Sequence, residues 1–350
     1  MSKTFPGRTG RHPARRSRFA KCAAIAVILA LATLGALGAT QSVILSAGWN
    51  AVYLEVDPAD PSPAGVFAGL PVDAVAAFEA ELDGAQFIRN PGVDLSQARG
   101  WAVWYAPRRA DAFLSTLYEI QGAKPYLIHA TTNATLVVAG DAPPAILKWQ
   151  PDAFNFVGFP VQAVGAPTFA QYFGASPAHS HNRIYRLAGG KWRQVLNPGT
   201  ETMRAGEAFW IFCDGTSDYT GPLEVTAPSP FGLALSQRGG SELVVRNRAA
   251  HPIAFRIEHA ADPQAPVPLS MDIDVFDQEA GMMRKLTRHF PAGDWEQQLP
   301  ALEPDEAIRL PLKLRAQDMA PGERRSLVTV LTDMGTKTVV PVTATRDDIP

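Results

Sequence analysis

Apolar and polar residues alternate along short stretches of this chain. In residues 48–56, and again in 153–161, every second position of the later half is apolar, as in Val52, Leu54 and Val56. A two-residue period places successive side chains on opposite faces of the backbone, so both stretches predict half-buried β-strands. Similar short stretches recur along the chain with turn residues between them. The pattern therefore predicts a mainly β protein.

The two stretches also match each other in sequence. Each begins with an aromatic residue and an asparagine, Trp49-Asn50 and Phe154-Asn155. An Asn-Pro-Gly triplet follows each one, and predicts a turn because proline fixes φ and glycine accepts positive φ. The remaining matches are between the triplets 90–92 and 197–199, between the aromatic strands 101–105 and 208–212, between 123–128 and 206–211, and between the late strands 135–138 and 222–225. Features repeated in the same order predict a duplicated β unit.

These boundaries divide the chain into four regions. Residues 1–39 form a leader, 40–145 a first β repeat, 146–228 a second β repeat, and 229–350 a third region that begins at a Pro-Ser-Pro linker. The first repeat carries an addition with helical spacing at 109–120, which predicts one short amphipathic helix. Its apolar positions are Ala110, Phe113, Leu114, Leu117 and Tyr118.

The third region has strand candidates at short intervals, about seven in about 115 residues, which predicts an antiparallel β-sandwich. The clearest are 243–245, 253–258, 271–276, 308–314, 327–331 and 339–342. The fold class expected for the whole chain is therefore mainly β. It consists of two related β-repeat units followed by an antiparallel β-sandwich, with one short helix in the first repeat.

Two resemblances rest on these patterns. A proline-acidic turn at Pro304-Asp305-Glu306 precedes a long alternating strand, and Pro321-Gly322 follows it. Residues 231–345 in this respect resemble bacterial immunoglobulin-like or fibronectin-type-III-like modules, although the Cys-Trp-Cys core of antibody domains is missing. The tandem aromatic-Asn repeats resemble those of uncharacterised exported bacterial proteins. That likeness implies a location more than an activity.

Charge is distributed unevenly along the chain. Residues 1–39 hold seven Lys or Arg and no Asp or Glu, so removing them changes the net charge from −2 to about −9. An acidic body argues against nucleic acid as a partner, since phosphate binding needs clustered cations.

The leader has the layout of a secretory signal peptide. A basic segment ends at Lys21, an apolar run follows from Cys22 to Leu37, and small residues close it at Gly38-Ala39. We expect export to the periplasm, the cell surface or the exterior. Cleavage near Gly38 or Ala39 is favoured, and an uncleaved signal anchor is the alternative. Cleavage would leave Cys213 as the one cysteine, so the body must fold without an intramolecular disulfide.

Sequence motifs for catalysis are mostly missing, including the Gly-x-Ser-x-Gly elbow, His-Glu-x-x-His and the phosphate-binding glycine loops. His179-Ser180-His181 could offer two imidazoles to a metal, but its Gly, Ser and Pro neighbours favour a solvated loop. An acidic cluster could bind calcium, but its alternation favours the wet face of a strand. That cluster is Asp272, Asp274, Asp277 and Glu279. Cys213 lacks a local base, so a structural thiol is favoured. We expect no catalytic residue, metal or cofactor.

Aromatic residues are the strongest candidates for ligand binding. Five of them could form a stacking platform for sugars or peptide side chains, namely Trp101, Trp104, Tyr105, Trp192 and Trp210. Large rings also dominate hydrophobic cores, so packing is the competing interpretation for each ring. Trp192 follows Gly189-Gly190-Lys191 in a hairpin-like turn and is the ring expected to be exposed.

These observations favour an exported, non-catalytic interaction or structural protein of the cell envelope or extracellular space. Its expected partner is an envelope or surface protein, and a glycan is possible through the exposed tryptophans. Nucleic acid is not expected, and a membrane is expected only through an uncleaved leader. A carbohydrate-binding module is the alternative function. An exported hydrolase is less favoured because catalytic motifs are mostly missing. It stays an alternative because dispersed carboxylate pairs cannot be recognised in the sequence.

Overall fold

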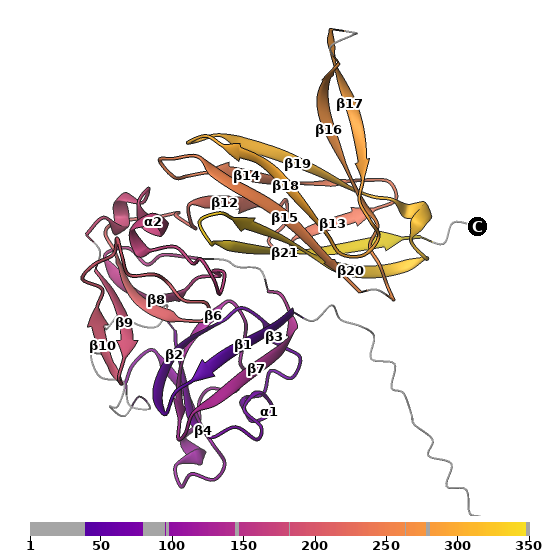
Figure 1. Cartoon of the computed structure of the whole chain (residues 1–350). Helices are drawn as coiled ribbons and strands as arrows, with labels where there is room; N and C mark the ends of the chain where they lie inside the picture. Colours follow the sequence, from indigo (N-terminus) through magenta and orange to yellow (C-terminus); the bar gives the residue numbers. More distant parts are fainter. Residues whose placement is uncertain are drawn as a thin grey trace, which may run out of the picture. The chain divides into compact units, whose positions relative to one another are not determined.

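A computed structural model describes residues 39–79, 95, 98–143, 147–181, 183–262, 264–277 and 281–347. The predicted leader, the first Asn-Pro-Gly triplet and Glu279 lie outside the described residues. Strands dominate the described chain, so the predicted mainly β fold is confirmed (Figure 1). Two short α-helices accompany them, α1 (Pro63–Val66) in the first predicted repeat and α2 (Phe169–Phe173) in the second.

Both helices begin at a capping side chain. The Ser62 hydroxyl accepts a hydrogen bond from the Gly65 amide at the start of α1. Thr168 does the same for the Gln171 amide at the start of α2, and the Gln171 side chain bonds back to the Thr168 amide. A capping box of this kind satisfies amides that have no partner inside the helix. These local sequences therefore fix where each helix starts.

The N-terminal half of the described chain contains three sheets, two with four strands and one with three. The three-stranded sheet has the order β1-β7-β3, and the four-stranded sheets have the orders β2-β6-β4-β5 and β10-β9-β11-β8. In chain order the strands are β1 (Ala39–Leu45), β2 (Gly48–Leu54), β3 (Asp57–Pro58), β4 (Val72–Phe78), β5 (Trp101–Tyr105), β6 (Lys124–Ala130), β7 (Ala134–Asp141), β8 (Ala153–Gly158), β9 (Ile184–Ala188), β10 (Lys191–Gln194) and β11 (Ala208–Cys213).

The two four-stranded sheets share one topology. In each, the first strand pairs with the last, the last pairs with the second, and the second pairs with the third, all antiparallel. Asn50 faces Ile128 across the first pair, and Asn155 faces Ile211. In this register β6 corresponds to β11, and β5 corresponds to β10. The sequence similarity between 123–128 and 206–211 therefore joins corresponding strands. The similarity between 101–105 and 208–212 joins β5 with β11, which do not correspond.

The two repeat asparagines also make matching hydrogen bonds. The Asn50 side chain accepts from the Ser46 amide at 2.9 Å and donates to the carbonyls of Ser46 and Gly48 at 2.8 and 3.0 Å. Asn155 accepts from the Gln150 amide at 2.7 Å and donates to the carbonyls of Gln150 and Ala153 at 3.1 and 3.0 Å. Each amide thus closes the loop that leads into its strand, which gives a physical reason for an asparagine at that position.

Hydrophobic clusters show which sheet faces pack together. Val43, Leu136, Val52 and Ile128 belong to one buried cluster, which joins the three-stranded sheet to one face of the β2-β6-β4-β5 sheet. The opposite face of that sheet and one face of the β10-β9-β11-β8 sheet share a second cluster, rich in aromatic rings. The remaining face of the latter sheet is covered by α2 and by loop residues that include Trp149. Each four-stranded sheet is therefore buried on both faces.

The helix predicted at 109–120 is wrong. The structure has a single 3₁₀ turn at Ala112–Leu114, and the following residues run beside β5. The amides of Thr116 and Leu117 donate to the Val103 carbonyl at 2.7 and 3.0 Å, and the Thr116 hydroxyl accepts from the Val103 amide at 3.0 Å. Hydrogen bonding to the strand edge thus replaces the bonds a helix would make within itself. Phe113 and Tyr118, expected on the apolar face, are exposed.

The C-terminal half forms a sandwich of two five-stranded sheets around its own core. One sheet has the order β12-β14-β19-β16-β17 and the other β13-β21-β20-β15-β18, with β13 parallel to β21 and the other pairs antiparallel. Their bounds are β12 (Leu223–Thr226), β13 (Leu233–Ser236), β14 (Ser241–Asn247), β15 (Ile253–Ala261), β16 (Leu269–Asp277), β17 (Met282–His289), β18 (Trp295–Leu302), β19 (Ala307–Leu314), β20 (Gly322–Thr332) and β21 (Lys337–Arg346).

Two features connect the sandwich with the preceding residues. Strand β12, predicted as the last strand of the second repeat, pairs with β14 of the sandwich. The turn between β20 and β21 bonds to the loop after β8: the Gln162 amide donates to the Gly335 carbonyl at 2.8 Å, and the Lys337 amide to the Pro160 carbonyl at 3.1 Å. All described residues belong to one compact unit, Gly35–Pro350.

Candidate functional site

The structure brings three of the predicted ligand-binding aromatics together inside the core. The ring centroids of Trp101 and Trp210 lie 6.3 Å apart, and those of Trp192 and Trp210 lie 6.4 Å apart. Phe156 stacks on Trp210 at 5.0 Å. Trp210 has no exposed surface, while Trp101, Trp192 and Tyr105 are each less than one-tenth exposed. Packing between the two sheets therefore accounts for this cluster.

The expectation that Trp192 is exposed is wrong. Its indole is 9% exposed because β10 turns the ring toward Phe156, at 5.9 Å. Trp104 points to the other face of its sheet, as the period of two predicts, and stacks on Phe67 at 5.8 Å. Ligand binding by these five residues stays a prediction. A ligand would have to reach rings that already contact other side chains.

His179 and His181 are held apart by different surroundings. His179 is 2% exposed, where a solvated loop was expected, and its Nδ1 lies 2.6 Å from the Ser176 hydroxyl. Burial, partly opposed by Asp214, lowers the pKa of His179 to about 4. His181 is exposed, and its Nδ1 lies 2.8 Å from an Asp214 carboxylate oxygen. The hydrogen bond from His181 holds the pKa of Asp214 below its ordinary value. The two imidazoles therefore do not share a ligand position.

The other polar candidates also have structural partners. The Cys213 thiol is buried and donates to the Gly215 carbonyl at 3.2 Å, and burial raises its pKa, which disfavours the nucleophilic thiolate. Asp272 accepts from the Lys313 ammonium at 2.6 Å and from the Thr287 hydroxyl at 2.8 Å, which lowers its pKa. Among the described residues no group of three or more His, Cys, Asp or Glu side chains is placed to hold a metal ion.

An aspartate–histidine pair that the sequence did not reveal lies on the first four-stranded sheet. Nδ1 of His129 on β6 lies 2.6 Å from the Asp73 carboxylate on β4, and Arg109 lies 3.5 Å from the same carboxylate. Such a pair can orient a general base. Within the described chain, however, no hydrogen bond joins His129 to a hydroxyl or thiol nucleophile. The pair joins residues 56 positions apart in sequence, so no local motif marks it.

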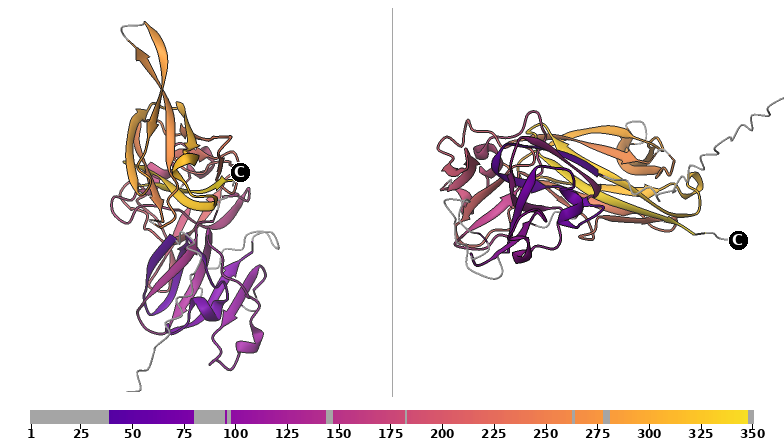
Figure 2. Two further views of the ribbon diagram at one scale, coloured as in Figure 1. Left: turned by 90° about the vertical axis from the view of Figure 1, so that its right-hand side faces the viewer. Right: turned by 90° about the horizontal axis from the view of Figure 1, so that it is seen from below.

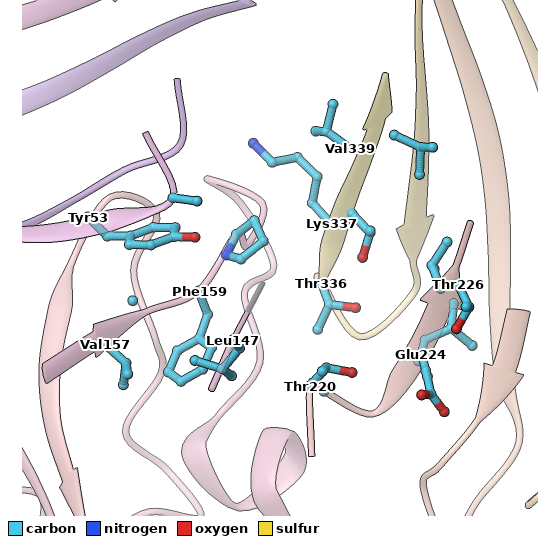
Figure 3. A pocket seen from close by; sticks show the side chains of 18 of the residues that line it. Tyr53, Leu147, Val157, Phe159, Thr220, Glu224, Thr226, Thr336, Lys337 and Val339 are labelled. Atoms are coloured by element: carbon cyan, nitrogen blue, oxygen red, sulfur yellow. The ribbon is translucent and has the colours of Figure 1, made fainter. Parts of the chain in front are cut away.

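A cleft of about 490 Å³ lies where the second repeat region meets the sandwich. Figure 3 shows Tyr53 and Phe159 on one side and Thr336, Lys337 and Thr226 on the other. The Lys337 ammonium is 2.5 Å from the Glu55 carboxylate, an ion pair that is less than one-third exposed at either end. The cleft walls are thus tied together by an ion pair and the backbone bonds of Gln162 and Lys337.

The β16–β17 hairpin projects from the sandwich as a two-stranded ribbon (Figures 1 and 2). Strand β16 pairs with β19 only over Leu269–Met271, but with β17 from Ser270 to Asp277. All eight residues of β17 are exposed, and the apolar side chains Met282, Met283 and Leu286 are each more than half exposed. The ribbon contributes little to the sandwich core beyond its base, so stability of the sandwich does not explain its length.

Strand β17 is also an open sheet edge. It is the last strand of its sheet, and no other described strand pairs with its outer side. Proteins usually shorten edge strands, place charged side chains on them or interrupt them with proline. Here β18 is equally long but carries Pro300, and β10, β12 and β13 have four residues each. Strand β17 carries Arg284, Lys285 and Arg288 and no acidic residue. Neither the length of β17 nor the exposure of its apolar residues could be recognised from its sequence, which does not alternate between apolar and polar residues.

No helix in the described part of the chain is long and apolar enough to cross a membrane. No protein-family model matches the chain, and no curated protein matches it.

Comparison with solved structures returns low overall similarity. A chain of the Salmonella enterica SafA pilin–SafB chaperone complex is 14% identical with a TM-score of 0.23, over 36% of this chain and 56% of that one. The PapD-like domain 7 of human CEP192 is 10% identical with a TM-score of 0.22, over 37% and 87%. The CupB6 tip adhesin of Pseudomonas aeruginosa is 10% identical with a TM-score of 0.19, over 90% and 86%. The match thus spans about half the length of the first of these chains.

Proposed function

We propose that this is an exported, non-catalytic interaction protein that binds a partner protein through the β16–β17 hairpin. The observation that supports this most directly is the exposure of all eight β17 residues on a ribbon that projects from its sheet. The exposed side chains of Met282, Met283 and Leu286 do not stabilise the fold by themselves, since apolar side chains stabilise a protein when they are buried. Exposed apolar side chains grouped on one element are typical of an interaction site.

The rest of the molecule serves as a scaffold in this proposal. The two four-stranded sheets and the sandwich each bury their aromatic and aliphatic residues in cores. The buried positions of Cys213 and His179, and the structural partners of Asp272, support a non-catalytic role. The basic and apolar leader supports export, with the acidic body outside the cytoplasm.

Site-specific cross-linking in the native host tests the proposed function. A photo-reactive amino acid replaces Met283 on the hairpin or, as a matched control, Val164, which is 86% exposed on a loop after β8. We expect a discrete protein adduct from position 283 and none from position 164. Equal labelling at both positions, or none at either, would contradict a hairpin-specific contact.

Export is tested separately by N-terminal sequencing of the protein recovered outside the cytoplasm. We expect a start near Gly38 to Thr40. A start at Met1 or Ser2 would rule out cleavage of the leader.

A further inference from the structure

We infer that the partner supplies an extended segment of alternating acidic and apolar residues, which adds as a further strand to the outer edge of β17. This inference rests on the proposed function and names the chemistry of the partner. Strand addition uses the backbone groups of an open sheet edge for affinity and the side chains on alternate positions for specificity. Strand β17 offers such an edge over eight residues, a length of about 26 Å at the usual rise.

The charge of β17 determines the charge of the segment. Arg284, Lys285 and Arg288 give the strand three positive charges within five positions, without an acidic residue in β17. Opposite charges directly across a strand pair stabilise it, and like charges destabilise it. A second copy of β17 on this edge would bring together two strands that each carry three positive charges. The partner strand is therefore acidic and is not another β17.

The strand already paired with β17 shows which pattern fits its side chains. Leu286 stands opposite Ile273, Lys285 opposite Asp274, and Thr287 opposite Asp272, while Arg284 and Arg288 stand opposite the apolar Val275 and Met271. Each β17 side chain lies between its neighbours on both sides in a sheet, so a strand on the outer edge meets the same residues from the other direction. An apolar residue opposite Leu286 and an acidic residue opposite Lys285 repeat the existing arrangement. The sequence of β16, Leu-Ser-Met-Asp-Ile-Asp-Val-Phe-Asp, is thus a model for the partner segment.

A membrane surface fits the ribbon less well. Exposed methionines beside cations are also found where proteins touch anionic lipid. In this ribbon, however, the cations lie on one strand, while β16 places Asp272, Asp274 and Asp277 in its sequence. Of these, Asp272 is held by Lys313 and Thr287 at the base of the ribbon. The open edge of β17 presents backbone donors and acceptors beside the cations, which an acidic strand would pair and a lipid surface would leave unpaired.

The test uses the full chain and a fluorescent peptide with the sequence of Leu269–Asp277 as the probe. We expect the peptide to bind, and a peptide with its aspartates replaced by lysine not to bind. The double variant Lys285→Glu/Arg288→Glu should weaken binding by about tenfold or more. Arg309→Glu, on a side chain that is 73% exposed in β19, is the matched control and should bind with the parent affinity. Because these side chains are exposed, the circular dichroism of each variant should match the parent.

Backbone methylation distinguishes strand addition from charge attraction alone. Two further peptides carry N-methyl groups on alternate residues, one set starting at Ser270 and the other at Met271. Because an edge-bound strand uses only one of its sides, we expect one peptide to bind like the parent and the other to fail. Equal binding of both, no binding of the parent peptide, or binding of phosphatidylglycerol vesicles in its place would overturn the inference. Cross-linking at position 283 in the host would still support the proposed function after such a failure.

Discussion

Burial of His179 makes the stability of this protein depend on pH. Its imidazole lies in an aromatic surrounding, with the ring centroids of Trp149, Phe173 and Tyr219 at 4.2, 4.9 and 6.5 Å. Nδ1 bonds to Ser176, and Nε2 is buried without a hydrogen-bond partner in the described structure. A proton on this ring would place a positive charge among apolar groups. The carboxylate of Asp214 also acts on it, but opposes the effect of burial only in part.

The size of the effect follows from the pKa difference. In the unfolded chain His179 takes up a proton near its ordinary pKa of 6.5, and in the folded chain only near about 4. Between these values the unfolded state binds more protons, so the free energy of unfolding falls by about 1.4 kcal/mol for each unit of pH decrease. The contribution of His179 is fully present above pH 6.5, and about 3 kcal/mol of it is lost by pH 4. Burial also lowers the pKa of His259, which adds to the loss in the same direction.

Urea unfolding measured at intervals from pH 7 to pH 4 tests this reasoning. The parent should lose stability steadily, and His179→Phe should show a smaller loss while keeping the part due to His259. Since Phe leaves Ser176 without its partner, the comparison is of the pH dependence and not of stability at pH 7. His251→Phe makes the same change on an exposed side chain and should keep the parent slope. Identical slopes for the parent and His179→Phe would refute the argument.

Three further predictions concern the core, the contact at Gly335 and the aromatic rings. Trp210→Ala should lower the free energy of unfolding by about 3–5 kcal/mol in chemical denaturation, while Tyr118→Ala, on a side chain 77% exposed, should change it by less than about 0.5 kcal/mol. Gly335→Ala should cost more than Gly281→Ala: both have positive φ, worth about 1–2 kcal/mol, but only at Gly335 would a Cβ meet the Gly165 oxygen, at 2.0 Å. Equal thermal shifts for these two variants would contradict that. Titration with a panel of polysaccharides should leave tryptophan fluorescence unchanged, because the rings of Trp101, Trp192 and Trp210 are buried; a saturable change would instead support the predicted aromatic platform.

The asparagine repeats show how far local sequence reaches. Period-two alternation correctly predicted strands around Val52 and Val157. The expectation that these strands are half-buried was wrong, because Tyr53 and Phe156 on their other faces are buried as well. The six strand candidates of the third region correspond to strands in the structure as well. Asn50 and Asn155 were recognisable because each bonds to backbone within five residues of itself. Interactions between residues this close along the chain can be recognised in the sequence.

Contacts between segments that are distant in sequence could not be predicted and are seen only in the folded chain. Residues 109–120 carry a helical pattern, but the edge of β5 offers their backbone alternative partners. Trp192 follows the Gly189-Gly190 turn, which suggested an exposed ring, but on β10 its ring packs against Phe156. The Asp73–His129 pair joins two strands whose register no local pattern shows.

The strands around Val52 and Val157 and the charge of β17 follow from the sequence by itself, because each depends on residues that are neighbours along the chain. The projection of the β16–β17 ribbon does not. Strand β16 leaves its partner β19 after Met271, although β19 itself continues from Leu312 back to Ala307 beside β14. Tertiary structure thus left β17 as an exposed edge, because burial depends on what lies beside a strand and not on its own residues.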